Sequence, residues 1–438
     1  MRISRPAAAG ACGAVLALAL AAGCSASPGP AAPGPASPGS ASPRARQTSR
    51  TAGPAPAAPD PPGGGLTPAQ LRAAYDLGPL LRHGINGKGQ TIVIVDSFGS
   101  PTIAGDLAVF DKQFGLPAPP SLRVIQPAGP VPPFRPTSRR TGEAGETTLD
   151  VESAHVIAPD ASILLVETPT LEEEGRSGFP QIVTAEDYVI RHHLGGVSSQ
   201  SFGATEQTFR SKASLRQLRG PYLLAAQPAY KVTVLAATGD TGAAGLTYST
   251  HGTFPAPAVG WPASDPLVTA VGGTQLDLTP AGARRRPDIA WNDGGGGRSS
   301  VFARPAYQDG VAGIVGNARG IPDISMDASC ESGMETYSSF VGGRPDWSMV
   351  CGTSLATPLF AGIVALADQE AGHPLGLINP ALYRMAAAHD RGIVDVTAGD
   401  NSSASVRGFP ARRGYDLVSG LGTIDAAYFV PELAKLAG

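Results

Sequence analysis

The chain is poor in charged residues. Only 16% of its 438 residues are charged, whereas 42% are hydrophobic. Disordered proteins show the opposite balance, so this composition excludes a chain that is disordered throughout and predicts a large buried core. No apolar run is long enough to cross a bilayer as a helix.

An excess of basic charge is also absent from most of the chain. Residues 65–438 carry 28 basic and 35 acidic groups, a net charge of −7. A mildly acidic body lacks the basic surface that nucleic acid requires, so we expect no nucleic-acid partner. We expect a monomer.

The first 24 residues resemble an export signal. Arg2 and Arg5 precede a short apolar run, Ala14–Ala22. The run ends in Ala-Ala-Gly-Cys24, which resembles a bacterial lipobox, in which the cysteine is lipidated. We therefore expect an exported lipoprotein, held on the outer face of the cell membrane through Cys24. The alternative is ordinary cleavage and release as a secreted protein.

Residues 25–64 lack every residue type that builds a core. They contain 11 prolines and no Val, Ile, Leu or aromatic residue. Such a segment predicts a disordered tether, followed by one folded domain over residues 65–438.

Strand patterns in this domain alternate with helical ones. Continuous β-branched or apolar runs stand at 91–95, 162–166 and 232–235. They predict an α/β fold with a mostly parallel central sheet, flanked by helices, in a single large catalytic domain. Asp96 and Asp240 follow two of these runs, at the edge where parallel sheets carry their active sites.

The segment Cys351-Gly-Thr-Ser-Leu-Ala-Thr-Pro358 comes directly before a long apolar run and predicts the start of a helix. Gly352 permits a tight turn, and Ser354 then lies at the helix start with Pro358 in the first turn. A serine there exposes its hydroxyl, and its N–H can point at an oxyanion. The alternative is a serine that only caps the helix.

A base for this serine has two candidate sources. His251 precedes a proline-rich segment that cannot continue a helix. In the helix predicted over 145–157, by contrast, Glu146 and Asp150 are four residues apart and share a face. Two like charges in that arrangement favour sharing a proton. Glu143 lies on the same face and competes as the base, and an ordinary solvated acidic face is the alternative.

Two cysteines, Cys330 and Cys351, fall in the folded domain. In an exported protein they predict one disulfide, with two buried thiols as the alternative.

Together these motifs resemble the sedolisin family, the serine-carboxyl peptidases with a subtilisin-like fold. The resemblance rests on Gly-Thr-Ser-x-Ala-x-Pro, on Glu146-x-x-Leu-Asp150 and on Thr238-Gly-Asp-Thr-Gly242. It implies an acid-active endopeptidase or tripeptidyl-peptidase that acts on proteins or peptides. The implied roles are nucleophile for Ser354, general base for Glu146, acid behind the base for Asp150, and oxyanion aspartate for Asp240.

The resemblance implies further sites. Its substrate cleft corresponds to Ser199, Ser201, Phe202 and Gly203. One structural calcium ion would be held by the carboxylates of Asp395 and Asp416 and by the carbonyls of Val396, Arg412 and Gly414, although the family usually has Gly where Arg412 stands. The family also carries a folded prodomain, whereas only the predicted tether precedes Leu66 here.

Two other functions stay open at this point. A His-dependent subtilase would use Asp96, His251 and Ser354. A surface binding module on an inactive peptidase fold would need none of these residues for catalysis.

Overall fold

The computed structural model describes residues 62–171, 178–247, 252–403 and 406–437. The predicted signal, Cys24, nearly all of the predicted tether, and His251 lie outside these ranges. Within them, no helix is long and apolar enough to cross a membrane.

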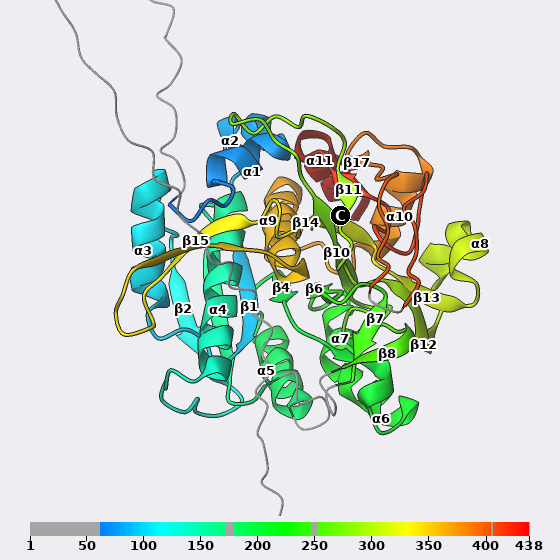
Figure 1. Ribbon diagram of the computed structural model, residues 1–438, viewed down its shortest axis with the longest axis horizontal. Helices are drawn as coiled ribbons and strands as arrows, with labels where there is room; N and C mark the ends of the chain where they lie inside the picture. Colours follow the sequence, from blue (N-terminus) through cyan, green and yellow to red (C-terminus); the bar gives the residue numbers. More distant parts are fainter. Residues whose placement is uncertain (1–61, 172–177, 248–251, 404–405, 438) are drawn as a thin grey trace, which may run out of the picture. The chain divides into compact units, whose positions relative to one another are not determined.

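An eight-stranded sheet forms the centre of the folded unit (Figure 1). In spatial order its strands are β11 (Ile289–Ala290), β10 (Thr269–Gln275), β6 (Thr233–Ala237), β4 (Val197–Gln200), β1 (Thr91–Ser97), β3 (Ser162–Thr168) and β2 (Leu122–Ile125), with β14 (Ile324–Asp327) also paired to β10. Only the β10–β11 pair is antiparallel. The predicted parallel α/β sheet is confirmed, and the runs at 91–95, 162–166 and 232–235 correspond to β1, β3 and β6.

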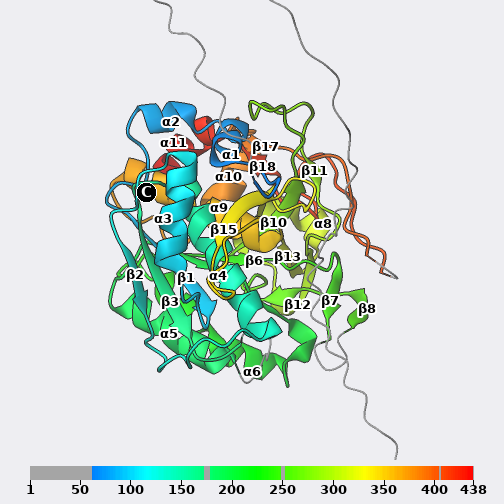
Figure 2. The ribbon, with the colours of Figure 1, turned by 60° about the vertical axis from the view of Figure 1, so that its left-hand side comes forward.

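Alternation along the strands divides the interior into two cores. In β1, Ile92 and Ile94 pack into one core, and Val93 and Val95 pack into the other. The first core lies under α1 (Pro68–Ala74), α2 (Gly78–Arg82), α3 (Ile103–Phe114), α4 (Ser138–Ile157), α9 (Thr353–Ala371), α10 (Asn379–Ala387) and α11 (Ala426–Ala437). The second lies under α5 (Phe179–Arg191), α6 (Lys212–Arg216) and α7 (Gly220–Ala225). Figures 1 and 2 show α3, α4 and α9 side by side over the first face.

Short elements complete the unit. The small antiparallel pairs are β5 (Ala204–Thr205) with β9 (Gly260–Trp261), β7 (Ala244–Leu246) with β8 (Thr253–Pro257), β12 (Gly297–Ala303) with β13 (Ala318–Ile321), β15 (Met334–Ser338) with β16 (Asp346–Val350), and β17 (Ile393–Val394) with β18 (Thr423–Ile424). The short helices are η2 (Glu206–Thr208), η3 (Gln217–Arg219), η4 (Ala306–Val311) and α8 (Ala312–Val315).

The N-terminal end of the folded unit is held by a carboxylate. The backbone N–H groups of Gly63 and Gly65 donate to the two side-chain oxygens of Glu335, at 2.5 and 2.8 Å. Gly63, which lies within the predicted tether, is therefore bound to the folded unit, because Glu335 satisfies backbone donors that the composition of residues 25–64 does not reveal.

Proline 358 lies deeper in its helix than the sequence predicts. The helix α9 begins at Thr353, directly after Gly352, and Pro358 is its sixth residue. The expectation that Pro358 lies in the first helical turn was wrong. The tight turn ends at Gly352, with φ 115°, so the helix already begins at Thr353 and its first turn is complete before Pro358. A proline at this position removes the N–H that would bind the carbonyl of Ser354. That carbonyl is left for another donor.

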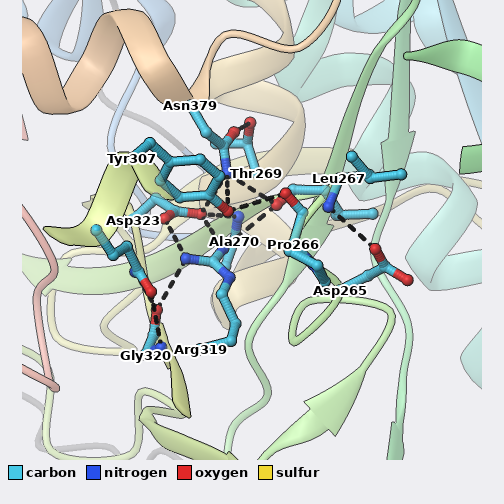
Figure 3. A network of polar contacts seen from close by, with 12 residues as sticks. Asp265, Pro266, Leu267, Thr269, Ala270, Tyr307, Arg319, Gly320, Asp323 and Asn379 are labelled. Carbon is cyan, nitrogen blue, oxygen red and sulfur yellow. Dashed lines mark hydrogen bonds and ion pairs between the residues drawn. The ribbon is translucent and has the colours of Figure 1, made fainter. Parts of the chain in front are cut away.

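A buried network around one ion pair lies where β13 leads into β14 (Figure 3). The guanidinium of Arg319 pairs with the carboxylate of Asp323, and both side chains are fully buried. Asp323 also accepts from the backbone N–H of Ala270 at 2.8 Å and from the hydroxyl of Tyr383 at 2.9 Å. Because Ala270 belongs to β10 and Tyr383 to α10, the network joins the sheet to α10.

The hairpin β15–β16 leads directly to α9, and its base is closed by a disulfide. The sulfur atoms of Cys330 and Cys351 are bonded, with a Cα–Cα distance of 4.9 Å. The bond joins Cys330, in the segment that leads into β15, to Cys351, the residue that follows β16.

We predict that this disulfide stabilises the domain. Closing a loop of 21 residues should contribute about 3 kcal/mol to the free energy of unfolding. Denaturant unfolding of the parent and of a Cys330→Ser/Cys351→Ser variant measures the difference. Reductant should destabilise the parent and leave the variant unchanged, and equal effects on both proteins would contradict the prediction.

Candidate active site

Helix α4 carries two of the predicted catalytic carboxyls, one turn apart. Glu146 is half-buried, and Asp150 is 0% exposed. Both lie on the helix that packs against α9. Glu152 and His155 on the same helix face other groups: Glu152 accepts from the N–H of Tyr337, and His155 pairs with Asp111.

Ser354 is the second residue of α9. The residue is half-exposed, and its side-chain oxygen lies 3.5 Å from the carbonyl oxygen of Ser201. Its N–H belongs to the first turn, whose donors have no partner in the helix backbone. The position therefore combines an accessible hydroxyl with a backbone donor.

Ser201 connects the two helices. Its hydroxyl donates to Oδ1 of Asp150 at 2.8 Å and lies 3.3 Å from the carbonyl oxygen of Ser354. This is the carbonyl that Pro358 leaves without a helical partner. Ser201, the residue directly after β4, thus bridges α4 and α9.

A third carboxyl, Asp96, completes the buried group. Asp96 lies in β1, is 4% exposed and is hydrogen-bonded to Asp150. Burial raises the pKa of Asp150 well above its ordinary value, and the charges of Asp96 and Glu146 raise it further, against the hydrogen bond from Ser201. Two carboxyls in contact favour one shared proton.

Asp240 lies beside the residue that precedes Ser354. Its Oδ1 accepts from the N–H and from the hydroxyl of Thr353, each at 2.8 Å. Desolvation by the surrounding protein raises the pKa of Asp240, while the bonds from Thr353 oppose the rise and the charge of Asp293 adds to it. Asp240 remains exposed as a residue, so solvent limits the size of this shift.

The predicted cleft residues separate in the structure. Ser199 is fully buried, and Phe202 points into the second core, 6.1 Å from the ring of Phe179. Gly203 is half-buried. A Cβ atom added there would lie 3.2 Å from the carbonyl oxygen of Trp261. Of the four, Ser201 is the residue that contacts the catalytic candidates.

The segments with the predicted calcium ligands meet near the C-terminus. The N–H of Gly414 donates to Oδ2 of Asp395 at 3.0 Å, and the N–H of Arg412 donates to Oδ2 of Asp416 at 2.7 Å. Val396 is buried next to Asp395. Two carboxylates and nearby backbone carbonyls are the oxygen ligands that calcium takes, so the donor set fits the ion.

Comparison with known proteins places this site in a family. Residues 139–406, well over half of the chain, match the Subtilase family. The chain belongs to the subtilase family, in its sedolisin branch. Kumamolisin of Bacillus sp. (strain MN-32) is 32% identical over 376 residues, which cover 82% of this chain and 61% of kumamolisin. Sedolisin of Pseudomonas sp. (strain 101) is 27% identical, over 65% of this chain and 49% of that protein.

A solved structure agrees with this assignment. Pseudomonas sedolisin, described as a serine-carboxyl proteinase and complexed with pseudo-iodotyrostatin, superposes with a TM-score of 0.73 at 26% identity. The match covers 85% of this chain and 99% of that chain. The chain spans only about half to three fifths of the length of the curated relatives, since it covers 61% of kumamolisin and 49% of the Pseudomonas protein. The solved sedolisin chain, by contrast, is matched over nearly its whole length.

We predict that Gly352 tolerates no side chain. Its φ of 115° disfavours other residues, and an added Cβ would lie 2.7 Å from Oδ2 of Asp240. Gly352→Ala should lower the free energy of unfolding by about 1–3 kcal/mol, measured by denaturant titration.

Gly105 is the matched control. It lies in α3, where no heavy atom comes within 4 Å of the position of an added Cβ. Gly105→Ala should be neutral or should stabilise the protein by up to about 1 kcal/mol. Equal effects of the two substitutions would show that the turn before α9 is not under this constraint.

Proposed function

We propose that this protein is an acid-active serine-carboxyl peptidase that hydrolyses peptide bonds in proteins or peptides. The contact that most supports the proposal is the bridge from Asp150 through the hydroxyl of Ser201 to the Ser354 residue. This bridge connects α4, which carries Asp150, with α9, which carries Ser354. The relatives of the chain are named as peptidases.

In the proposed reaction, the Ser354 hydroxyl attacks the carbonyl carbon of the scissile peptide bond. Glu146 takes the hydroxyl proton, while Asp150, bonded to Ser201 and Asp96, supports Glu146 from the interior. The proton then passes to the leaving amine as the C–N bond breaks. Water attacks the acyl-enzyme in the same way and releases the second product.

The negative oxygen of the tetrahedral intermediate needs donors. The N–H of Ser354 supplies one, and the protonated carboxyl of Asp240 supplies another. Asp240 can donate only while it keeps its proton, and the raised pKa extends that state toward higher pH. Glu146 must be ionised at least in part, so both demands are met together only in acid.

The other two functions have less support. The His-dependent reading requires His251, which lies outside the described residues, and Asp96 contacts Asp150 where that reading needs a histidine. The inactive binding module is disfavoured because Ser354, Glu146, Asp150 and Asp240 are all present. Relatives include kumamolisin and proteins named tripeptidyl-peptidases, so analysis of product length must decide between endopeptidase and tripeptidyl activity.

We also propose export, with lipidation at Cys24 or release as a secreted protein. The support is the charged start, short apolar run and Cys24 ending of the first 24 residues.

We predict an activity maximum below about pH 5 with little activity at neutrality. The protonated fraction of Asp240 falls about tenfold per pH unit above its pKa, whereas Glu146 can take the proton of Ser354 only in its ionised form. Ser354→Ala and Glu146→Ala should abolish cleavage of an unspecific peptide substrate. Ser201→Ala should lower kcat by about tenfold or more, because Asp150 loses the donor that favours its ionised form.

His251→Ala is the control and should keep nearly full activity. Activity that instead rises through about pH 6.5 and disappears on changing His251 would contradict the carboxyl mechanism.

Calcium is proposed as a structural ion held by the carboxylates of Asp395 and Asp416 and by the carbonyls of Val396, Arg412 and Gly414. Bound there, it would join the two C-terminal segments and take no part in the reaction.

We predict that a chelator lowers the unfolding temperature. An ion present at about 100 times its Kd contributes about 2.7 kcal/mol to the native state. Asp416→Ala should remove this response. Asp400, an exposed acid in a neighbouring segment, is the control, and Asp400→Ala should retain it. A parent protein that is indifferent to chelators and free of calcium by elemental analysis would contradict the assignment.

A further inference from the structure

The strand that leads to Ser201 is held from its other face by a buried acid. Glu186 lies on α5, and a single side-chain oxygen, Oε1, accepts from the hydroxyl of Ser198 at 2.8 Å and from the side-chain amide of Gln200 at 2.5 Å. Gln200 and Ser201 are consecutive, so their side chains leave the chain on opposite faces. Gln200 therefore meets Glu186 while Ser201 meets Asp150.

Among the residues that the structure describes, none forms an ion pair with Glu186. The side chain is 0% exposed, and in the described ranges its second oxygen, Oε2, has no hydrogen-bond partner. Tyr222 of α7 is a titratable group close to Glu186, and its hydroxyl donates to Oε1 of Gln200 at 2.9 Å. Beyond it, Asp265 is already paired with Arg219.

This environment favours the protonated acid. An ionised carboxylate would place charge on Oε2 where the described residues offer no donor, and burying such a charge is costly. Burial accordingly raises the pKa of Glu186 to about 7, against the hydrogen bonds from Ser198 and Gln200.

We propose that Glu186 is a positioning residue: its protonated side chain holds the end of β4, and through it Ser201, in place for the reaction. The catalytic consequence of this inference rests on the proposed function. The contact of Glu186 with Ser198 and Gln200, which we call the brace, can be tested without measuring activity. Glu186 touches neither Ser354 nor Asp150, so it acts through Gln200 and Ser201.

The consequence is a strand end that is firm in acid and loosens toward neutrality. The pKa of Glu186 is about 7 in the folded protein and 4.5 for the free side chain, so between these values the folded state binds more protons. The stabilisation is complete below about pH 4.5 and is lost as the pH rises through about 7. This loosening is separate from the deprotonation of Asp240.

Hydrogen–deuterium exchange of the full chain tests the brace directly. Peptides that cover residues 196–203 are compared at about pH 5 and about pH 7.5, after correction for the intrinsic rate. In the parent, exchange of these amides should rise about tenfold. In Glu186→Gln it should rise less than about twofold, because the neutral amide keeps the acceptor for Ser198 and Gln200 at both values.

Asp327→Asn is the matched control. Asp327 is also a buried acid with a raised pKa, but it lies on β14 and its Oδ1 accepts from the hydroxyl of Ser332 at 2.6 Å. This variant should change the pH dependence of global unfolding and leave the exchange of residues 196–203 like that of the parent.

Kinetics in acid provide the second readout. Glu186→Gln should keep kcat and KM within about twofold of the parent, whereas Glu186→Ala should lower kcat about tenfold with KM changed less than about threefold. The split is expected because Ser201 contacts Asp150 and Ser354. Tyr222→Phe removes only the hydroxyl that donates to Gln200, so its kcat should lie between those of Glu186→Gln and Glu186→Ala.

The proposal is overturned if the parent and Glu186→Gln show the same rise in exchange. It is also overturned if a folded Glu186→Ala keeps parental kcat and KM. Should Glu186→Ala fail to fold, the exchange comparison with Glu186→Gln still decides. A protein without peptidase activity that shows the expected exchange difference would refute the proposed function and retain the brace.

Discussion

Burial of carboxyl groups without cations is the constraint that connects the parts of this protein. Asp150 is fully buried and hydrogen-bonded to Asp96, and Glu186 is fully buried with no ion-pair partner in the described part of the chain. Such groups stay buried at low cost only while they keep or share a proton. Asp240, the proposed oxyanion residue, likewise donates a hydrogen bond only while its carboxyl keeps a proton. In the proposed mechanism, the reaction and the packing beneath it both depend on carboxyl groups that keep a proton.

The start of α9 shows how one short segment serves several ends. Gly352 turns the chain where a Cβ would meet Asp240, Thr353 donates to that aspartate, and Ser354, the proposed nucleophile, follows. Pro358 then leaves the carbonyl of Ser354 free of a helical partner, and the hydroxyl of Ser201 lies close enough to use it. Local backbone restrictions therefore support the contact between β4 and α9.

Paired charge is used elsewhere in the domain, away from the site. Arg319 and Asp323 neutralise each other in the interior and recruit Ala270 and Tyr383. Replacing one member would leave an uncompensated buried charge, so the pair ties together the elements that carry it. The contrast with Glu186 is instructive, because an unpaired acid makes its strand sensitive to protonation.

Much of the architecture and part of the site were predictable from the sequence. Apolar β-branched runs determined β1, β3 and β6, the spacing of Glu146 and Asp150 determined their common helix face, and the Gly-Thr-Ser motif determined the start of α9, although not the depth of Pro358 within it. The tertiary structure alone decided that Asp96 contacts Asp150, that Ser201 bridges to Ser354, that Phe202 turns into the second core, and that Glu186 holds Gln200. These residues are distant in the chain, and they meet only because a parallel sheet aligns its strand ends while alternation sends neighbouring side chains to opposite faces.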